Sequence, residues 1–533
     1  MFYKSRLTRR AFGAGGLAGL LMLGTRRGWT QTNTPGDGIP RKRPEAVGAN
    51  PSAILDFVSA MESSGGELHS LMIYRRGGVI AEGWWSPYRP ELLHMQHSLT
   101  KSVTATAVGI AIGEGRFSLS DKVVSFFPEH LPTNVSEHLA AMTVRDLATM
   151  RIGARVTVSG KQWRPYQTSW IKKFFELPIP DPPGTTFLYS SAPSYMLSAI
   201  VQKTTGQTTH EYLKPRFFEP LQIEGIAWDV SPEGINPGGN GLSCKTSDLL
   251  KLAAVHLQGG KWRDRQIVPK DWVTAALSPQ VSAGSDISPL ISALNKENGS
   301  NVKLAPWHGY GYQWWMGPGR AAFAGGAFGQ YSILMPDYDL ALAITAAQPI
   351  SAGEALLPLV WEHAPRIVDE SKAASGADDR LRQHLRHLRL ISPPAYTPSS
   401  RTASLSRKFN IQPNDQGISA VSFEFLKNEC RFKIWDAHGE HAVDVGLGRF
   451  AEGRTNVTSH TLHYEYEPAD GMRVAAFGEW KDADTFVMTW QFIESAFRDT
   501  VTCHLQGDQL LIDRKVNVNN GPLSVPTIRG VPA

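Results

Sequence analysis

The chain has 533 residues, of which 42% are hydrophobic and 19% are charged, as is typical of folded globular domains. Its length is sufficient for two or more domains. The formal net charge of +5 depends on six basic residues in the first 27 positions, and removing them leaves −1. A chain that is nearly neutral beyond this segment gives no electrostatic reason to expect a nucleic acid or an anionic membrane as a partner.

The first 34 residues have the pattern of an export signal. A basic start at residues 4–10 precedes an apolar run at 11–24, which is short for a membrane span and has the length of a signal-peptide core. The Thr-Arg-Arg-Ala-Phe sequence at 8–12 resembles a twin-arginine signal. A general secretory signal or an uncleaved anchor is the alternative, and no Ala-x-Ala cleavage site is visible. We expect a periplasmic or secreted protein with no stable membrane span after signal removal.

The next part of the chain predicts strands at its two ends and helices between them. Residues 71–83 predict a β-hairpin, and residues 331–335 and 340–344 predict two further strands joined at Pro336-Asp337. Helices are predicted from Ser98 to about Gly113 and over 142–150, 193–203 and 247–258, with a loop over 121–128. This order favours a mixed sheet with a helical insertion.

The last part of the chain has a different periodicity. A small, polar boundary at 370–379 is followed by a short basic amphipathic helix with Leu381, Leu385 and Leu388 on one face. From about residue 396, apolar residues alternate with polar ones over 421–425, 432–434, 462–466, 486–492 and 501–505. The alternation predicts an antiparallel β-barrel or sandwich.

The chain has three cysteines, Cys244, Cys430 and Cys503, and no Cys-x-x-Cys pair. This spacing disfavours a structural zinc site and a thioredoxin-like site. Cys430 and Cys503 fall in the same predicted domain, and an oxidising compartment would allow them to pair. Two buried free thiols are the equally favoured alternative.

Ser98 and Lys101 form a Ser-x-x-Lys motif at the start of the long apolar helix. Ser is a preferred N-cap residue, so we expect Ser98 to cap this helix. Residues three apart share a helix face, which places Lys101 beside the Ser98 hydroxyl. A lysine packed against apolar walls can have its pKa lowered enough to take a proton from that hydroxyl. The free N–H groups of a helix start also suit a developing oxyanion.

Other residues near these patterns are weaker candidates. Ser169 and Lys172 have the same spacing, but Lys173 adjoins them and no long apolar helix follows. His97 invites a Ser-His interpretation, but no Asp partner can be assigned, so we expect a packed or solvent-facing imidazole. His94 and His97 have no further carboxylate or His at metal-ligand spacing, and we expect no bound metal.

Further motifs follow Ser98 in order. Tyr189-Ser190-Ser191 resembles the Tyr-x-Asn element of the serine β-lactamase and penicillin-binding protein fold, and residues 183–191 with Gly206-Gln207 resemble its class C branch and esterase relatives. Residues 142–150, 239–249 and 326–330 resemble three other segments of that branch, the last being the glycine-rich strand that closes the active site. The resemblance covers about residues 45–365.

This resemblance implies an α/β mixed fold, with an antiparallel sheet flanked by helices and a helical subdomain. We expect a leader over 1–34, a β-lactamase-like serine hydrolase domain over 45–368, a linker with the amphipathic helix over 369–395 and an antiparallel β domain over 396–533.

The resemblance also implies acyl transfer through a covalent acyl-enzyme, with no cofactor. Ser98 would attack a carbonyl, Lys101 would accept its proton, and Tyr189 would relay protons to the leaving group. The backbone N–H groups of Ser98 and Ala327 would form the oxyanion hole. A buried aromatic with one hydrogen bond is the alternative for Tyr189.

Two departures from the family's motifs narrow the class of substrate that we expect. Ser191 replaces the usual Asn, and residues 323–327 read Phe-Ala-Gly-Gly-Ala where the family has Lys-Thr-Gly or His-x-Gly. Lys203-Thr204-Thr205-Gly206 sits at a predicted helix end instead. We therefore expect a hydrolase of a small ester, amide or short peptide, similar to aminohexanoate-oligomer hydrolases and carboxylesterases. A non-catalytic binding or sensor module, and a peptidoglycan D-Ala peptidase or β-lactamase, are the alternatives.

Overall fold

The computed structural model describes residues 36–283, 308–349, 355–372, 374–457, 461–463 and 471–533. The predicted export signal lies outside these residues. Within the described ranges, no helix is both long enough and apolar enough to cross a membrane.

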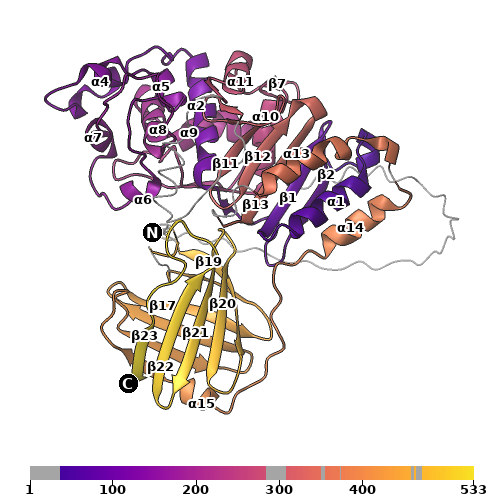
Figure 1. Cartoon of the computed structure of the whole chain (residues 1–533), viewed down its shortest axis with the longest axis vertical. Coiled ribbons are helices and arrows are strands. Elements are labelled where there is room, and N and C mark those ends of the chain that lie inside the picture. Colours follow the sequence, from indigo (N-terminus) through magenta and orange to yellow (C-terminus); the bar gives the residue numbers. More distant parts are fainter. Residues whose placement is uncertain (1–35, 284–307, 350–354, 373, 458–460, 464–470) are drawn as a thin grey trace, which may run out of the picture. The chain divides into compact units, whose positions relative to one another are not determined.

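The first domain is built on an eight-stranded sheet with the order β2-β1-β13-β12-β11-β10-β9-β8 (Figure 1). Every neighbouring pair is antiparallel, so the sheet is not the mixed sheet that element order alone favoured. The predicted hairpin and strand pair are confirmed and occupy one half of the sheet. The strands are β1 (Glu67–Arg75), β2 (Gly78–Trp84), β8 (Val281–Ser282), β9 (Gly309–Tyr310), β10 (Trp315–Met316), β11 (Ala322–Gly326), β12 (Gln330–Met335) and β13 (Leu340–Ala347).

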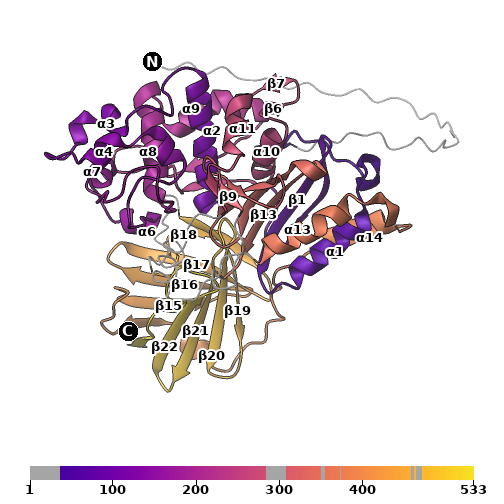
Figure 2. The same ribbon diagram turned by 45° about the horizontal axis from the view of Figure 1, so that its top comes forward.

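Helices cover both faces of this sheet. Every residue of β13 is buried, because each face of the strand meets an apolar helix surface. On one face lie α1 (Pro51–Glu62), α13 (Leu356–Ile367) and α14 (Ala377–Arg386), which group together in Figures 1 and 2. The other face carries α10 (Thr246–Leu257).

The amphipathic helix expected after the first domain is α14. Its Leu381 is buried in the same core as α1 and the sheet. Gly83 in β2 leaves space for α14 and for the residues directly after it, because a Cβ atom there would lie 3.1 Å from Leu385 in the helix and 2.5 Å from Leu388 beyond its end. The segment therefore packs onto the sheet domain.

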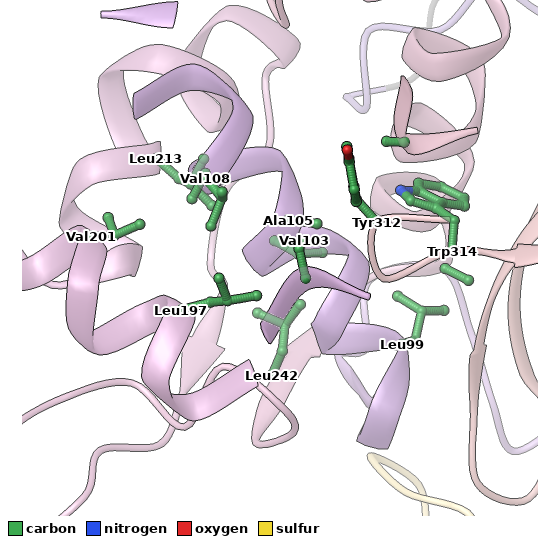
Figure 3. Packing of buried hydrophobic residues seen from close by; sticks show 14 of the residues in the cluster. Leu99, Val103, Ala105, Val108, Leu197, Val201, Leu213, Leu242, Tyr312 and Trp314 are labelled. Carbon is green, nitrogen blue, oxygen red and sulfur yellow. The ribbon is translucent and has the colours of Figure 1, made fainter. Parts of the chain in front are cut away.

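The helical part of the domain is organised around α2 (Thr100–Gly113), in which residues 100–111 are all buried. Figure 3 shows Leu197 and Val201 of α8 (Ser191–Thr205) on one side of α2 and Tyr312 and Trp314 on the other. Small and apolar residues allow α2 to be buried all round, and the buried hydroxyls of Ser102, Thr104 and Thr106 each donate to a backbone carbonyl. The loop predicted at 121–128 contains a short helix, α3 (Val123–Phe126). The other helices here are α4 (Glu137–Ala141), α5 (Val144–Ala148), α6 (Gly160–Trp163), α7 (Trp170–Phe175), α9 (Thr209–Leu213) and α11 (Lys270–Ala276).

The C-terminal domain is a closed β-barrel, which decides between the predicted barrel and sandwich. Nine strands run in the order β17-β16-β15-β14-β23-β22-β21-β20-β19, and pairing of β17 with β19 closes the ring, with β18 flanking β19. The strands are β14 (Lys408–Ile411), β15 (Ala420–Phe425), β16 (Glu429–Asp436), β17 (Gly439–Leu447), β18 (Ala451–Thr455), β19 (Met472–Trp480), β20 (Thr485–Phe492), β21 (Arg498–Gln506), β22 (Gln509–Val516) and β23 (Ile528–Pro532).

The structure also tests the strand predicted at 462–466 and the pairing of the two cysteines of this domain. The strand predicted at 462–466 is wrong at its start, because residues 461–463 form a turn, and residues 464–466 lie outside the described part. Leu462 and His463 are both fully buried in that turn. The apolar residue at 462 is therefore explained by burial within a turn and does not indicate a strand. Cys430 and Cys503 are both buried and free, so they do not form a disulfide.

Candidate active site

Ser98 lies in a short 3-10 turn, η2 (His97–Leu99), that links strand β3 (His94–Met95) to α2. The prediction that Ser98 caps α2 is wrong: the N-cap position belongs to Leu99, and no side chain caps this end of the helix. The Thr100 hydroxyl instead donates to the His97 carbonyl at 2.6 Å and so stabilises the turn. The extra turn leaves the Ser98 hydroxyl facing Lys101, as the spacing of three residues predicts.

Lys101 is 1% exposed, and its Nζ donates to three oxygens. These are the Ser98 Oγ at 3.1 Å, the Ser191 Oγ at 3.3 Å and the Gly239 carbonyl at 2.8 Å. Burial lowers the pKa of Lys101 to about 7, because the charged ammonium loses its hydration. A large fraction of the side chain is therefore a neutral amine at neutral pH, beside a hydroxyl from which it can take a proton.

Gly239 is a partner of Lys101 that sequence reasoning did not single out as a site residue. A Cβ atom at this position would lie 3.0 Å from the Cβ of Ser191, so the close approach of the two segments needs a small residue. The Gly-Asn-Gly-Leu-Ser sequence that begins here carries the only sequence signal for this role.

Tyr189 is half-buried and lies beside the ammonium of Lys101. The Lys101 Nζ is 4.8 Å from the centre of its ring, within the range of a cation–π contact. Trp315 and Tyr310 hold the ring from other directions, with centroid distances of 5.1 Å and 6.2 Å. The next residue, Ser190, is the N-cap of α8 and accepts a hydrogen bond from the Ala192 N–H. This cap starts the helix where Ser191 reaches Lys101.

Ala327 lies directly after β11, in the turn that leads to β12. Gly326 meets the turn that contains Ser98, because a Cβ atom at Gly326 would lie 2.1 Å from the Gln96 carbonyl oxygen. The fully buried Gln330 fixes the orientation of the Ala327 peptide, donating to the Ala327 carbonyl at 3.1 Å and to the Ala346 carbonyl at 2.8 Å. The end of β11 and the Ser98 turn are therefore held in direct backbone contact.

The histidines near Ser98 are packed. His97 is 4% exposed and meets the edges of Phe328 and Phe497, and burial lowers its pKa to about 3. His94 is buried and shares a 3.0 Å hydrogen bond with His69. Among the residues that the structure describes, no group of three or more His, Cys, Asp or Glu side chains is placed to hold a metal ion.

The second Ser-x-x-Lys match has a structural role. Ser169 is the N-cap of α7, accepting a hydrogen bond from the Lys172 N–H, and its hydroxyl donates to Glu233 at 2.6 Å. The Lys172 side chain is exposed, whereas that of Lys101 is buried.

The two segments in which the sequence departs from the family pattern lie in β11 and at the end of α8. Residues 322–326 form β11 and carry no cationic side chain beside Ala327. Lys203 lies in the last turn of α8 and pairs with Glu129 at 2.8 Å. Gly206 ends that helix in a left-handed conformation with φ of 73°, so the Lys-Thr-Thr-Gly sequence is a helix terminus.

The chain is similar to several known proteins, over 52% to 90% of its length for the three described here. The 6-aminohexanoate-dimer hydrolase of Paenarthrobacter ureafaciens is 25% identical over 296 residues, which are 52% of this chain and 72% of that protein. A solved penicillin-binding protein homologue from Pyrococcus abyssi is 14% identical, covering 90% of this chain and 99% of its own, with a TM-score of 0.44. EstCE1, described as a hydrolase with promiscuous acyltransferase activity, is 14% identical over 60% of this chain and 97% of its own, with a TM-score of 0.46.

A family model described as Beta-lactamase matches residues 61–364, more than half of the chain. The matched segment includes the eight strands of the sheet, α2 with its preceding turn, and each residue that contacts Lys101. The chain therefore belongs to the Beta-lactamase family, whose members are serine hydrolases.

Proposed function

We propose that this protein is an exported serine hydrolase that cleaves an ester or an amide through a covalent acyl-serine intermediate. The observation that carries the proposal is the 3.1 Å contact between the Lys101 Nζ and the Ser98 Oγ, together with the burial that lowers the pKa of Lys101 to about 7. A hydroxyl beside a neutral amine is an activated nucleophile.

In the first half of this reaction, the Ser98 Oγ attacks the substrate carbonyl carbon while its proton moves to the Lys101 Nζ. The backbone N–H groups of Ser98 and Ala327 stabilise the negative charge on the carbonyl oxygen. Collapse of the tetrahedral intermediate breaks the bond to the leaving group. The proton held by Lys101 passes through Tyr189 to the leaving group, so Lys101 is a neutral amine again. The acyl group is then bonded to Ser98 Oγ.

In the second half, a water molecule attacks the acyl carbon and gives a proton to Lys101. The bond to Ser98 Oγ breaks, Lys101 returns the proton to that oxygen, and the carboxylic acid leaves. No step requires a cofactor, because the amine, the phenol and the peptide N–H groups supply every proton transfer and every hydrogen bond.

The substrate class proposed is a small ester, amide or short peptide. The relative from Paenarthrobacter ureafaciens is named for hydrolysis of the 6-aminohexanoate dimer, a short linear amide. Ser191 in place of Asn and the uncharged Phe-Ala-Gly-Gly sequence of β11 both favour an ester or linear amide over a β-lactam. Export rests on the basic and apolar pattern of residues 1–34, with the Arg9-Arg10 pair as its most specific part.

A fluorophosphonate probe that forms a bond to active serines tests the proposal. We expect the wild-type protein to be labelled and Ser98→Ala to remain unlabelled; equal labelling of both would overturn the assignment. Lys101→Ala should slow labelling by at least about a thousandfold, since nucleophile and base act as one unit. Lys172→Ala is the matched control, because it removes the lysine of the second Ser-x-x-Lys match, and it should label at the wild-type rate.

A fluorescent penicillin separates the substrate classes. Stable labelling of Ser98 by penicillin would favour a peptidoglycan D-Ala peptidase, and rapid turnover of penicillin would favour a β-lactamase. Turnover of short esters and amides without penicillin labelling is the expected result. A folded protein that is labelled by no probe and hydrolyses no substrate would instead support a binding or sensor module.

A further inference from the structure

Three aromatic rings pack together beside the Ser98 turn, and we refer to His97, Phe328 and Phe497 as the aromatic cluster. His97 is 4% exposed, Phe328 3% and Phe497 0%. The ring centroids are 5.2 Å apart for His97 and Phe328, 5.7 Å for Phe328 and Phe497, and 6.3 Å for His97 and Phe497, and all three pairs are edge-on. Burial disfavours the imidazolium of His97, so its ring packs as a neutral aromatic.

Two members of the cluster have backbone conformations that side chains rarely adopt. His97 has φ of 48° and Phe328 has φ of 67°. Such conformations at residues other than glycine persist only where their surroundings fix them. The edge-on packing of the three buried rings supplies these surroundings from the side-chain side.

The positions of these two residues in the chain connect them to catalysis. His97 directly precedes Ser98, and Phe328 directly follows Ala327. The conformation at His97 therefore helps to set the direction of the Ser98 N–H, which belongs to the peptide that joins the two residues. Phe328 anchors the turn in which Ala327 lies, from the residue after it. The N–H groups of Ser98 and Ala327 are the two proposed for the oxyanion hole.

Phe497 comes from the barrel, and the turn that carries it is bonded to the sheet domain. The Met95 N–H donates to the Glu494 carbonyl at 2.9 Å, two residues before His97. The Tyr88 hydroxyl donates to the Ser495 carbonyl at 2.8 Å and accepts from Gln491 at 2.7 Å. The turn between β20 and β21 is thus bonded to the sheet domain at Glu494 and Ser495, just before Phe497.

We propose that Phe497 is a positioning residue through which the barrel holds the oxyanion hole in its working geometry. Its ring supports His97 and Phe328 together. His97 orients the N–H of Ser98, and Phe328 anchors the turn that carries the N–H of Ala327. The inference rests on the proposed function, because it needs an oxyanion to be stabilised at those groups. It gives the barrel a direct part in acylation at Ser98.

The test measures the second-order rate constant for fluorophosphonate labelling of full-length protein, alongside its thermal unfolding midpoint. Phe497→Leu should slow labelling by about ten- to a hundredfold, less than the loss of a whole oxyanion donor. The matched control is Phe423→Leu, a barrel aromatic that is 2% exposed and packs on Phe409 and Phe432. It should lower the unfolding midpoint similarly and leave labelling within about twofold of wild type.

A double variant tests whether Phe497 acts through Phe328. Phe328→Leu should slow labelling to a similar extent, and the Phe328→Leu, Phe497→Leu double variant should be no slower than the slower single variant. Additive losses, or labelling of Phe497→Leu at the rate of Phe423→Leu, would overturn the inference. If Phe497→Leu does not fold, Phe497→Met removes the ring at similar volume and must show the same loss. Absence of Ser98 labelling in the wild type would instead overturn the proposed function.

Discussion

The Nζ of Lys101 lies 3.1 Å from the Oγ of Ser98, in surroundings where the lysine is 1% exposed. The same nitrogen also donates to Ser191 and to the Gly239 carbonyl. Burial favours the neutral amine and lowers the pKa of Lys101 to about 7, where a general base is most effective near neutral pH. Hydrogen bonds to oxygen acceptors act in the opposite direction, because they stabilise the ammonium.

The first prediction concerns pH. Since only the neutral amine of Lys101 can accept the proton of Ser98, the labelling rate of an uncharged fluorophosphonate should rise about tenfold per pH unit below a midpoint near 7. Above that midpoint the rate should level off. Labelling rates measured from pH 5 to pH 9 in one buffer series check this, and a rate that is constant from pH 5 to pH 7 would contradict it.

The second prediction concerns Ser191. Ser191→Ala removes one of the three acceptors that stabilise the ammonium of Lys101, so the pKa of Lys101 should fall further. The midpoint of the pH–labelling profile should therefore move to lower pH than in the wild type. Thr185→Ala, which alters an exposed hydroxyl bonded to the Pro182 carbonyl, is the control and should leave the midpoint unchanged. A shift of the Ser191→Ala midpoint to higher pH would contradict the assignment.

The third prediction concerns the contact between β11 and the Ser98 turn. Gly326→Ala places a Cβ 2.1 Å from the Gln96 carbonyl oxygen, so the two backbones must separate. We expect labelling to slow by at least about tenfold, because a small misplacement of catalytic groups has a large effect on rate.

The neighbouring glycine is the control for this substitution. A Cβ at Gly325 would first meet the Phe323 ring at 3.4 Å, which is ordinary van der Waals contact. Gly325→Ala should therefore label within about twofold of wild type. Equal labelling by both variants would show that the β11 contact does not set the geometry of the site.

The fourth prediction concerns a charged group inside the barrel. Asp499 is 0% exposed and pairs with His463 at 2.9 Å and with Arg514 at 2.6 Å. Asp499→Asn leaves the Arg514 charge buried without its carboxylate, and the free energy of unfolding should fall by about 3–5 kcal/mol. Asp444→Asn is the control, because it removes the carboxylate from a half-exposed ion pair with Arg431. It should lower the free energy of unfolding by only about 0–1 kcal/mol. Denaturant unfolding of each full-length variant gives these values, and equal effects would contradict the prediction.

Much of the fold follows from local pattern. The hairpin of β1 and β2, the apolar α2 and the period-two strands of the barrel were all predictable, because apolar spacing determines which face of an element is buried. The pairing of β17 with β19 that closes the barrel joins segments about 30 residues apart and leaves no local signal. The spacing of Ser98 and Lys101 predicted their contact correctly.

The rest of the site depends on tertiary contacts. The 3-10 turn that moves Ser98 out of the cap position is held by Thr100 and by the neighbouring strand β3, so capping preference at Ser98 gave the wrong position. The Gly239 carbonyl that binds Lys101 and the Phe497 ring beside His97 come from distant parts of the chain. Their proximity to Ser98 cannot be read from residue type or spacing.

The measurement that tests the central claim most directly is intact mass spectrometry of the full-length protein mixed with a panel of slow esters, short amides and β-lactams. A single acyl adduct should form with at least one ester or amide, and peptide mapping should place it on Ser98. Ser98→Ala should show no adduct. An adduct on another residue, or turnover of these substrates by Ser98→Ala at the wild-type rate, would contradict acyl transfer through Ser98.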